Sequence, residues 1–153
     1  MNTRIANLIS LGRLVEEAAS DDEVRGLWSH ASEAYEDAAL PNRSPNRRLT
    51  SAYDAGRIAA LAVVRTANLR VRAQNHHEVT LAAAGLLAGE ELQMLLQEFQ
   101  ALRLERIQIE YGWKTRASVD DVNRVLPKVL AILEHGSRWI SSERRTVNLP
   151  PTT

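Results

Sequence analysis

The sequence predicts an all-α fold, built as an antiparallel bundle of four to five helices. Every long segment places apolar residues at the spacing of an α-helix, and no segment sustains the period-two alternation of a half-buried strand. Prolines, glycines and short polar runs separate these segments. The chain has 153 residues, of which 44% are hydrophobic, so it is long enough to bury the core of one domain.

Two helices are predicted in the first forty residues. Apolar residues at helical spacing mark residues 3–19, and a second helix is expected from about residue 22 to residue 40. Asp21 or Asp22 can cap this second helix, because a carboxylate accepts hydrogen bonds from the first backbone N–H groups. The same pattern also fits one longer, bent helix.

A loop is predicted over residues 40–45, which contain two prolines together with Asn and Ser. Ser44 followed by Pro45 is a favourable N-cap and first-turn pair, so the next helix should begin here and continue to about Ala73. This helix is rich in alanine. Because small residues permit neighbouring helices to approach closely, we expect it to occupy the centre of the bundle.

The second half of the chain begins with a polar break at residues 74–77. A short helix is expected over residues 78–87, and Gly89 should end or bend it. Residues 90–111 carry the clearest helical pattern of the chain, with leucine and phenylalanine on one side. Gly112 follows this helix in the position where glycine most often ends one.

The last helix is predicted to begin near Ser118, which forms a capping-box pattern with Asp121 three residues later. It completes a single domain of residues 1–145, with its core in residues 22–141. Residues 146–153 are expected to form a flexible C-terminal tail, because they contain two prolines and few apolar residues.

The composition limits the classes of protein to which the chain can belong. It contains no cysteine, which excludes disulfides and thiolate zinc sites. The N-terminal segment is not typical of a secretory signal peptide, and the apolar stretches are too short to span a membrane. We therefore expect a soluble, cytoplasmic protein that does not associate with membranes.

The formal net charge is zero, but the charges are unevenly distributed. Residues 42–72 contain seven arginines and one aspartate, whereas the segments on both sides of them are acidic. A basic block of this kind can attract phosphate groups. Arginines that are solvated on exposed helix faces would give the same pattern.

Arg106 and Glu110 form the first candidate site, on the helix predicted over residues 90–111. They are one helical turn apart, and this spacing is typical of an ion pair that neutralises a half-buried arginine. In the functional interpretation, Arg106 contacts phosphate, Glu110 positions it and Tyr111 lies beside it. Arg103, on the same helix, is a further candidate for ligand binding.

The second candidate site lies at a predicted helix end and polar break and contains Arg70, Arg72, His76 and His77. A histidine near arginines can act as a general acid or base on a phosphodiester near pH 7. The alternative is ordinary helix-end chemistry, in which cations stabilise the negative end of the helix dipole.

Trp113 is the third candidate, in the charged turn that follows Gly112. An exposed tryptophan beside Lys114 and Arg116 can stack on a nucleobase or contact a partner protein. The alternative is that Trp113 folds back over the end of the bundle.

Cofactors and metal ions are not expected. The sequence has no glycine-rich phosphate loop, no Gly-x-Ser-x-Gly motif, no His-Glu-x-x-His motif and no paired metal carboxylates.

Residues 49–140 resemble the HEPN superfamily, in particular the small bacterial proteins encoded beside minimal nucleotidyltransferases. Three stretches carry the likeness: the Ala-rich helix start at residues 49–57, the His-His helix start at residues 76–79, and residues 104–112, which end in Arg-x-x-x-Glu-Tyr-Gly. The helix start at residues 118–121 also fits.

This resemblance implies a HEPN-like helical bundle that forms a homodimer, with a cleft shared between two copies. Active ribonucleases of the superfamily have a histidine about four to six residues after the conserved arginine. Arg106 corresponds to that arginine, and Tyr111 stands where the histidine is expected. If the protein is an enzyme, Arg106 and Tyr111 are therefore its expected catalytic residues.

We accordingly expect a dimeric module that binds RNA, a nucleotide or a partner protein, for example a minimal nucleotidyltransferase in a toxin–antitoxin or defence system. Arg72, His76, His77, Arg103, Glu110 and Trp113 are its expected binding residues. One alternative is a metal-independent RNA endonuclease that uses Arg106. The other is a purely structural interaction protein.

Overall fold

The computed structural model describes residues 2–110 and 116–149, with side chains described for residues 2–105 and 116–149. Within these ranges 75% of the chain is helical, in six helices, which confirms the predicted all-α bundle. The elements in chain order are α1 (Thr3–Ser10), β1 (Leu14–Glu16), α2 (Asp21–Ala39), α3 (Pro45–Thr66), β2 (Leu69–Val71), α4 (His76–Ala88), α5 (Glu90–Glu110) and α6 (Val119–Glu143).

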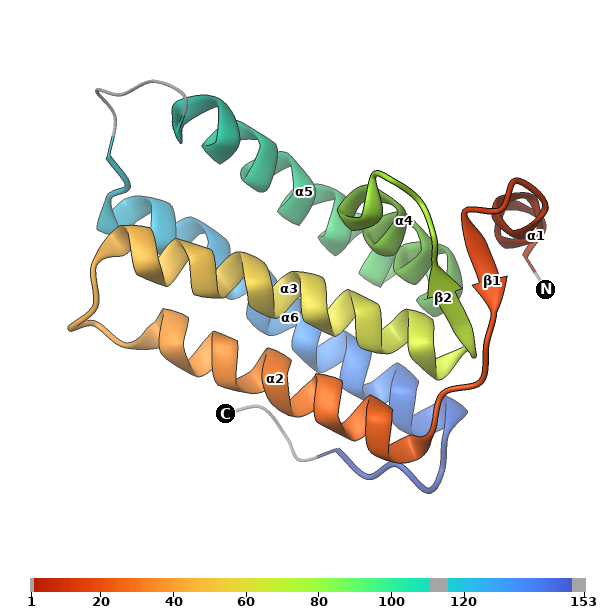
Figure 1. Ribbon diagram of the computed structural model, residues 1–153. Helices are drawn as coiled ribbons and strands as arrows, with labels where there is room; N and C mark the ends of the chain where they lie inside the picture. Colours follow the sequence, from red (N-terminus) through yellow and green to blue (C-terminus); the bar gives the residue numbers. More distant parts are fainter. Residues whose placement is uncertain (1, 111–115, 150–153) are drawn as a thin grey trace.

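The four long helices form an antiparallel bundle, in which α2 and α5 run opposite to α3 and α6 (Figure 1). Helix α3 packs against α2, α4 and α6, as its small side chains predict. Helix α4 lies against α3 and α5, while α1 stands at one end of the bundle beside β1. None of the described helices is long and apolar enough to cross a lipid bilayer.

Two of the helix starts predicted from the sequence are confirmed by their capping contacts. The Ser44 side chain accepts a hydrogen bond from the Arg47 backbone N–H, and Pro45 is the first residue of α3. At the start of α6, Ser118 and Asp121 form a reciprocal capping box. Each of these contacts satisfies backbone N–H groups that have no partner within the helix.

The prediction of a helix over residues 3–19 is wrong beyond Ser10, and so is the alternative of one long, bent helix. Gly12 adopts a φ of +72°, a left-handed conformation that ends the helical path and that glycine adopts without steric cost. The chain then forms β1, which pairs antiparallel with β2 so that Leu14 lies opposite Val71. Both of these side chains are buried, and they attach the short ribbon to the core.

The central helix also ends earlier than predicted, at Thr66 instead of Ala73. Asn68 adopts a φ of +58°, which asparagine tolerates better than most residues, and the chain turns into β2. The predicted polar break at residues 74–77 is shorter than expected, because His76 and His77 form the first turn of α4. Gly89, with a φ of +104°, separates α4 from α5 as predicted.

Two arginines connect segments that are distant in the sequence. The first, Arg65, is only 7% exposed, and it pairs with Glu17 and Glu23 (Nη1–Oε2 3.3 Å and Nε–Oε2 2.5 Å). It also donates to the carbonyl oxygens of Glu17, Ala18 and Leu69 at 3.0–3.2 Å. One side chain therefore fixes the linker before α2, the first turn of α2 and the start of β2.

The second, Arg144, follows the last residue of α6 and contacts the same region. Its guanidinium donates to the Ala19 carbonyl at 2.8 Å, the Asp21 carboxylate at 3.0 Å and the Thr66 carbonyl at 3.1 Å. A fourth bond, at 3.0 Å, reaches the side chain of Asn68. These bonds attach the end of α6 to the start of α2 and the end of α3.

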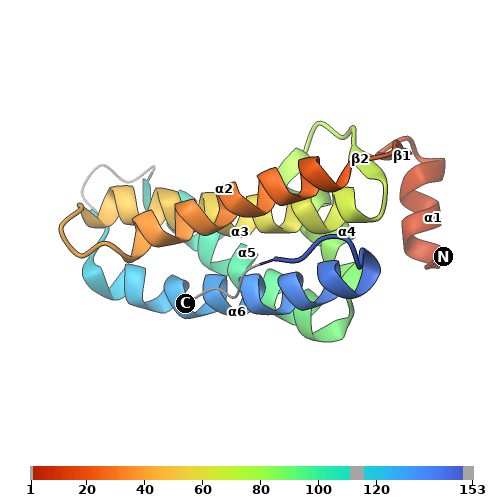
Figure 2. The ribbon, with the colours of Figure 1, turned by 90° about the horizontal axis from the view of Figure 1, so that it is seen from below.

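The described part of the C-terminal tail packs against the bundle. Val147 is 1% exposed, Thr146 donates its hydroxyl to Asp21, and Arg25 donates to the Thr146 carbonyl at 2.7 Å. Figure 2 shows this segment running back along the bundle between α2 and α6. The packed domain therefore includes residues 146–149, and residues 150–153 lie outside the described ranges.

Candidate functional site

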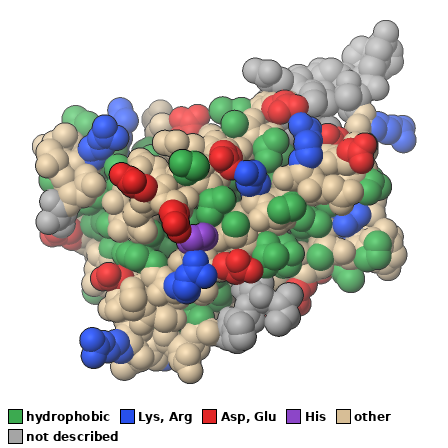
Figure 3. All heavy atoms as spheres, turned by 180° about the vertical axis from the view of Figure 1, so that it is seen from behind, with side chains coloured by type: hydrophobic (Ala, Val, Ile, Leu, Met, Phe, Trp, Pro, Cys, Tyr) green, Lys and Arg blue, Asp and Glu red, His purple; other side chains and the backbone are tan. Residues whose placement is uncertain are grey.

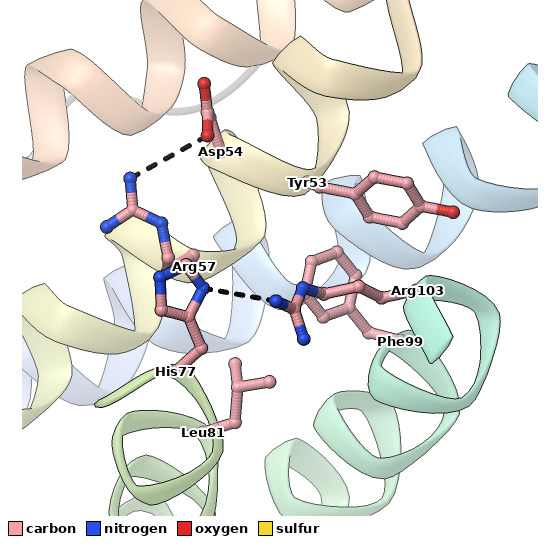
Figure 4. Close-up of a pocket in the computed structure, with 7 residues that line it drawn as sticks. All are labelled: Tyr53, Asp54, Arg57, His77, Leu81, Phe99 and Arg103. Carbon is pink, nitrogen blue, oxygen red and sulfur yellow. Dashed lines mark hydrogen bonds and ion pairs between the residues drawn. The ribbon is translucent and has the colours of Figure 1, made fainter. Parts of the chain in front are cut away.

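A small pocket lies where α3, α4 and α5 meet (Figure 4). It is lined by Tyr53, Asp54, Arg57, His77, Leu81, Phe99 and Arg103. Its volume is about 60 Å³, enough for several water molecules or one compact group such as a phosphate. Sites that enclose a whole drug-sized ligand are larger, with volumes of about 300 Å³ or more.

The helical repeat brings the polar residues of the pocket together. Asp54 and Arg57 lie about one turn apart on α3, His77 is the second residue of α4, and Arg103 lies in the second half of α5. Figure 4 shows the side chains of Arg57, His77 and Arg103 converging from these three helices.

Phe99 forms the apolar floor of the pocket and is fully buried. Its ring meets the Tyr53 ring edge to face, with centroids 5.7 Å apart and planes at 62°. The ring also lies against Gly56, where an added Cβ would come within 2.4 Å of Phe99 Cζ. Glycine at position 56 therefore allows α5 to approach α3 closely, and this approach places Arg103 opposite Arg57.

The pocket contains more positive than negative charge. Arg57 Nη2 pairs with Asp54 Oδ1 at 3.7 Å, and both side chains remain partly exposed. Arg103 forms no ion pair with any residue that the structure describes; its Nη2 is 3.5 Å from Nδ1 of His77. Because a guanidinium only donates hydrogen bonds, this long contact requires an unprotonated Nδ1. The neutral form of His77 is therefore the one that fits the contact with Arg103.

Electrostatics also favours neutral His77. Partial burial and the nearby positive charges of Arg57, Arg103 and His76 lower its pKa below the usual 6.5, while Asp54 opposes this shift. At neutral pH the pocket thus offers two guanidinium groups and a neutral imidazole that can accept a proton.

The lowered pKa of His77 predicts a change of stability with pH. As the pH falls below about 6.5, the unfolded chain binds a proton at His77 before the folded chain does, so the free energy of unfolding should decrease. His77→Gln should remove this part of the decrease and leave stability near pH 8 almost unchanged. Urea unfolding of both proteins between about pH 5 and pH 8 measures the effect, and equal pH dependence in the two would contradict it.

Only some of the residues predicted from the sequence lie in the pocket. His77 and Arg103, from two separate candidate groups, meet in the pocket. His76 and Arg72 are exposed and do not line it; Arg72 follows β2, where its backbone N–H donates to the Arg13 carbonyl at 2.9 Å.

The remaining predicted residues have side chains outside those that the structure describes. The side chains of Arg106 and Glu110 lie outside the described residues, although their backbone belongs to α5. Tyr111 and Trp113 lie outside the described ranges altogether. Their expected catalytic and binding roles therefore stay predictions.

Sequence reasoning missed Asp54, Arg57 and Phe99 as members of the pocket. Arg57 belongs to the basic block of residues 42–72, and its one-turn separation from Tyr53 was a signal that both side chains share one face of the helix. The sequence contained no indication that α4 and α5 would cover this face.

The charged surface outside the pocket is mixed. On the face seen from behind in Figure 3, basic and acidic side chains lie among hydrophobic ones. In the described ranges, no three His, Asp or Glu side chains come together in an arrangement that could hold a metal ion.

The sequence matches no known protein-family model, and searches of curated proteins and of solved structures found no significant match. The pocket itself is therefore the basis for a proposal about function.

Proposed function

We propose that the protein recognises a phosphate group in the Arg57–His77–Arg103 pocket, as part of a module that binds RNA or a nucleotide. The observation that carries the proposal is the convergence of two guanidinium groups from different helices, of which Arg103 has no carboxylate partner among the described residues. Planar guanidinium groups suit the bidentate binding of phosphate oxygens. The volume of the pocket also matches one phosphate better than a whole nucleotide.

The wider function that we propose follows the HEPN-like expectation. The module acts as a homodimer, the phosphate belongs to RNA or to a nucleotide, and a minimal nucleotidyltransferase is the proposed partner. The pocket is compatible with a longer ligand because Asp54 and His77, two of the residues that line it, are exposed, so the rest of the ligand can extend into solvent from the bound phosphate.

A second candidate function is metal-independent cleavage of RNA, and the position of His77 favours it. A neutral imidazole beside two guanidinium groups can accept a proton from a ribose 2′-hydroxyl, whose oxygen then bonds to phosphorus as the bond to the 5′-oxygen breaks, while the arginines stabilise charge on the phosphate. The protonated imidazole can then return the proton to the 5′-oxygen that leaves. His77 would then supply the proton transfer expected of the superfamily's histidine, from a different place in the sequence.

The two arginines should both contribute to phosphate binding. We expect Arg103→Ala and Arg57→Ala each to weaken binding of inorganic phosphate, AMP and single-stranded RNA by about tenfold or more, because each removes charge-assisted hydrogen bonds. NMR titration measures these affinities. Bound phosphate should also raise the pKa of His77, because its negative charge favours the protonated imidazole. Arg138→Ala, which removes an exposed arginine of α6, is the control and should leave binding unchanged.

The same purified proteins also test the homodimer and the cleavage of RNA. Mass measurement in solution tests the homodimer, and an RNA-cleavage assay with wild type and His77→Gln tests the second candidate. Phosphate binding without cleavage supports the binding module. If Arg57→Ala and Arg103→Ala fold normally and bind all three ligands as well as wild type does, phosphate recognition by this pocket is refuted.

A further inference from the structure

Two buried apolar side chains close the inner end of the Arg57–His77–Arg103 pocket (the phosphate pocket). Leu81 is 5% exposed and Phe99 is fully buried, and both line it. Asp54 and His77 are the exposed members of the lining. A ligand bound in the pocket therefore continues into solvent on the side of Asp54 and His77.

The size of the phosphate pocket limits what can enter it. Its volume of about 60 Å³ has room for one phosphate group. In a diphosphate or triphosphate, the second phosphate would have to lie at the opening. An internal phosphodiester of RNA would have to direct both of its ester oxygens out through the same opening, whereas a terminal phosphate directs only one.

Asp54 places a negative charge at this opening. Its side chain is 51% exposed, against 34% for Arg57, and its Oδ1 is 3.7 Å from Arg57 Nη2. A contact of this length and exposure neutralises the carboxylate only weakly, so a second phosphate at the opening would be repelled. Repulsion of the wrong ligand is one of the two ways in which a site achieves specificity.

The first phosphate meets the opposite charge. Arg57 and Arg103 converge on the pocket from α3 and α5 (Figure 4), and Arg103 has no carboxylate partner among the described residues. Helix α4 begins at the same pocket without a side-chain N-cap, so the positive end of its dipole also favours an anion. A terminal phosphate carries nearly two negative charges near pH 7, and an internal phosphodiester carries one. The pocket should therefore bind the terminal group more strongly.

We infer that the phosphate pocket selects a single terminal phosphate, that is, a phosphomonoester, and that Asp54 discriminates against ligands that carry a second phosphate beside the first. The inference rests on the proposed binding of phosphate and names the class of phosphate that is bound. A nucleoside monophosphate and the 5′-phosphate end of an RNA both present this group. Nucleoside triphosphates and internal phosphodiesters bind more weakly.

Nucleotides test the role of Asp54. NMR titration of the full-length protein with AMP, ADP and ATP gives the three affinities. We expect ATP to bind at least about fivefold more weakly than AMP in spite of its larger charge, and Asp54→Asn to reduce this ratio by about two- to fivefold. Asp22→Asn removes an equivalent carboxylate three residues before Arg25 on α2, outside the pocket, and should leave the ratio unchanged.

RNA tests the selection of a terminal group. A single-stranded RNA with a 5′-phosphate should bind at least about tenfold more tightly than the same RNA with a 5′-hydroxyl, because only the first offers a phosphomonoester. Binding of AMP but of neither RNA would identify a free nucleotide as the source of the phosphomonoester.

Three results would overturn the inference: ATP binding as tightly as AMP, RNA binding equally well with either 5′ end, or an unchanged AMP-to-ATP ratio in Asp54→Asn. Phosphate recognition by the pocket would survive each of them if Arg103→Ala still weakened binding. If neither inorganic phosphate nor AMP binds, the proposed function fails, and the inference fails with it.

Discussion

Replacing Arg65 with alanine is expected to lower the free energy of unfolding by about 3–5 kcal/mol, which is a large part of the stability of a domain of this size. Two effects combine in this loss. The side chain is 7% exposed, and its removal leaves Glu23 without its cation and Glu17 with Arg70 alone. The carbonyl of Leu69 also loses its buried donor, and an unsatisfied buried acceptor adds a further cost.

Urea unfolding followed by circular dichroism measures this loss, with Arg124→Ala as the control. Arg124 pairs with Glu105 and Asp121, but its side chain is 53% exposed, so its removal should cost less than about 1 kcal/mol. A similar small effect in Arg65→Ala would show that the buried network contributes little.

The pH dependence provides a second readout for Arg65. Its hydrogen bond lowers the pKa of Glu23 below the usual 4.5. The folded chain therefore holds the Glu23 carboxylate charged at pH values where the unfolded chain protonates it, and this contribution to stability is lost as the pH falls below about 4.5. In Arg65→Ala the free energy of unfolding should therefore decrease less as the pH falls below about 4.5.

Replacing Phe99 with alanine is expected to lower the free energy of unfolding by about 3–5 kcal/mol and to abolish the phosphate pocket. The ring is fully buried between α3 and α5 and forms the floor of the pocket. Its loss removes the transfer energy of the ring and leaves a cavity beside Gly56. Arg103, one turn later on α5, then loses its fixed position opposite Arg57.

The contact between Gly56 and Phe99 allows this prediction to be tested with a double-mutant cycle. Gly56→Ala in wild type should cost about 1–3 kcal/mol, because the added methyl would come within 2.4 Å of Phe99 Cζ. In the Phe99→Ala background the methyl enters vacated space, so the same substitution should cost much less. Thermal and urea unfolding of the four proteins give the coupling energy, and additive effects would contradict the contact.

Gly26→Ala is the matched control for Gly56→Ala. Gly26 also lies inside a helix, but an added Cβ at this position has no atom within 4 Å. Alanine here should stabilise the protein by about 0.5–1 kcal/mol, because it restricts the unfolded chain and favours the helix.

Local sequence signals predicted the bundle and most of its helices. Ser44, Pro45, Gly89 and the Ser118–Asp121 box act within one turn of their own positions, so they can be interpreted without knowing the fold. The β-ribbon could not be predicted in this way, because its formation depends on residues that are distant in the sequence. Strands of three residues are too short to show a period, and their pairing joins positions 14–16 with 69–71.

The candidate site was predictable only in part. Arg103 and His77 were selected for their chemistry, which the sequence displays directly. Their meeting with Arg57 depends on how three helices pack, and Phe99 against Gly56 fixes that packing. The proposed catalytic pair of Arg106 and Tyr111 stays a prediction, and so do the dimer and its partner.

The bonds of Arg65 and Arg144 have a consequence for the order of folding. They join residues 17–23 to residues 65–69, and the end of α6 to residues 19–21, which are separated by more than 120 positions. Closing loops of this length is entropically costly, so such contacts are expected to form after the main folding barrier has been crossed. The two arginines would then act chiefly on the rate at which the native protein opens. Both chain ends would be released in the same event, which would make this corner of the bundle the determinant of its lifetime in the folded state.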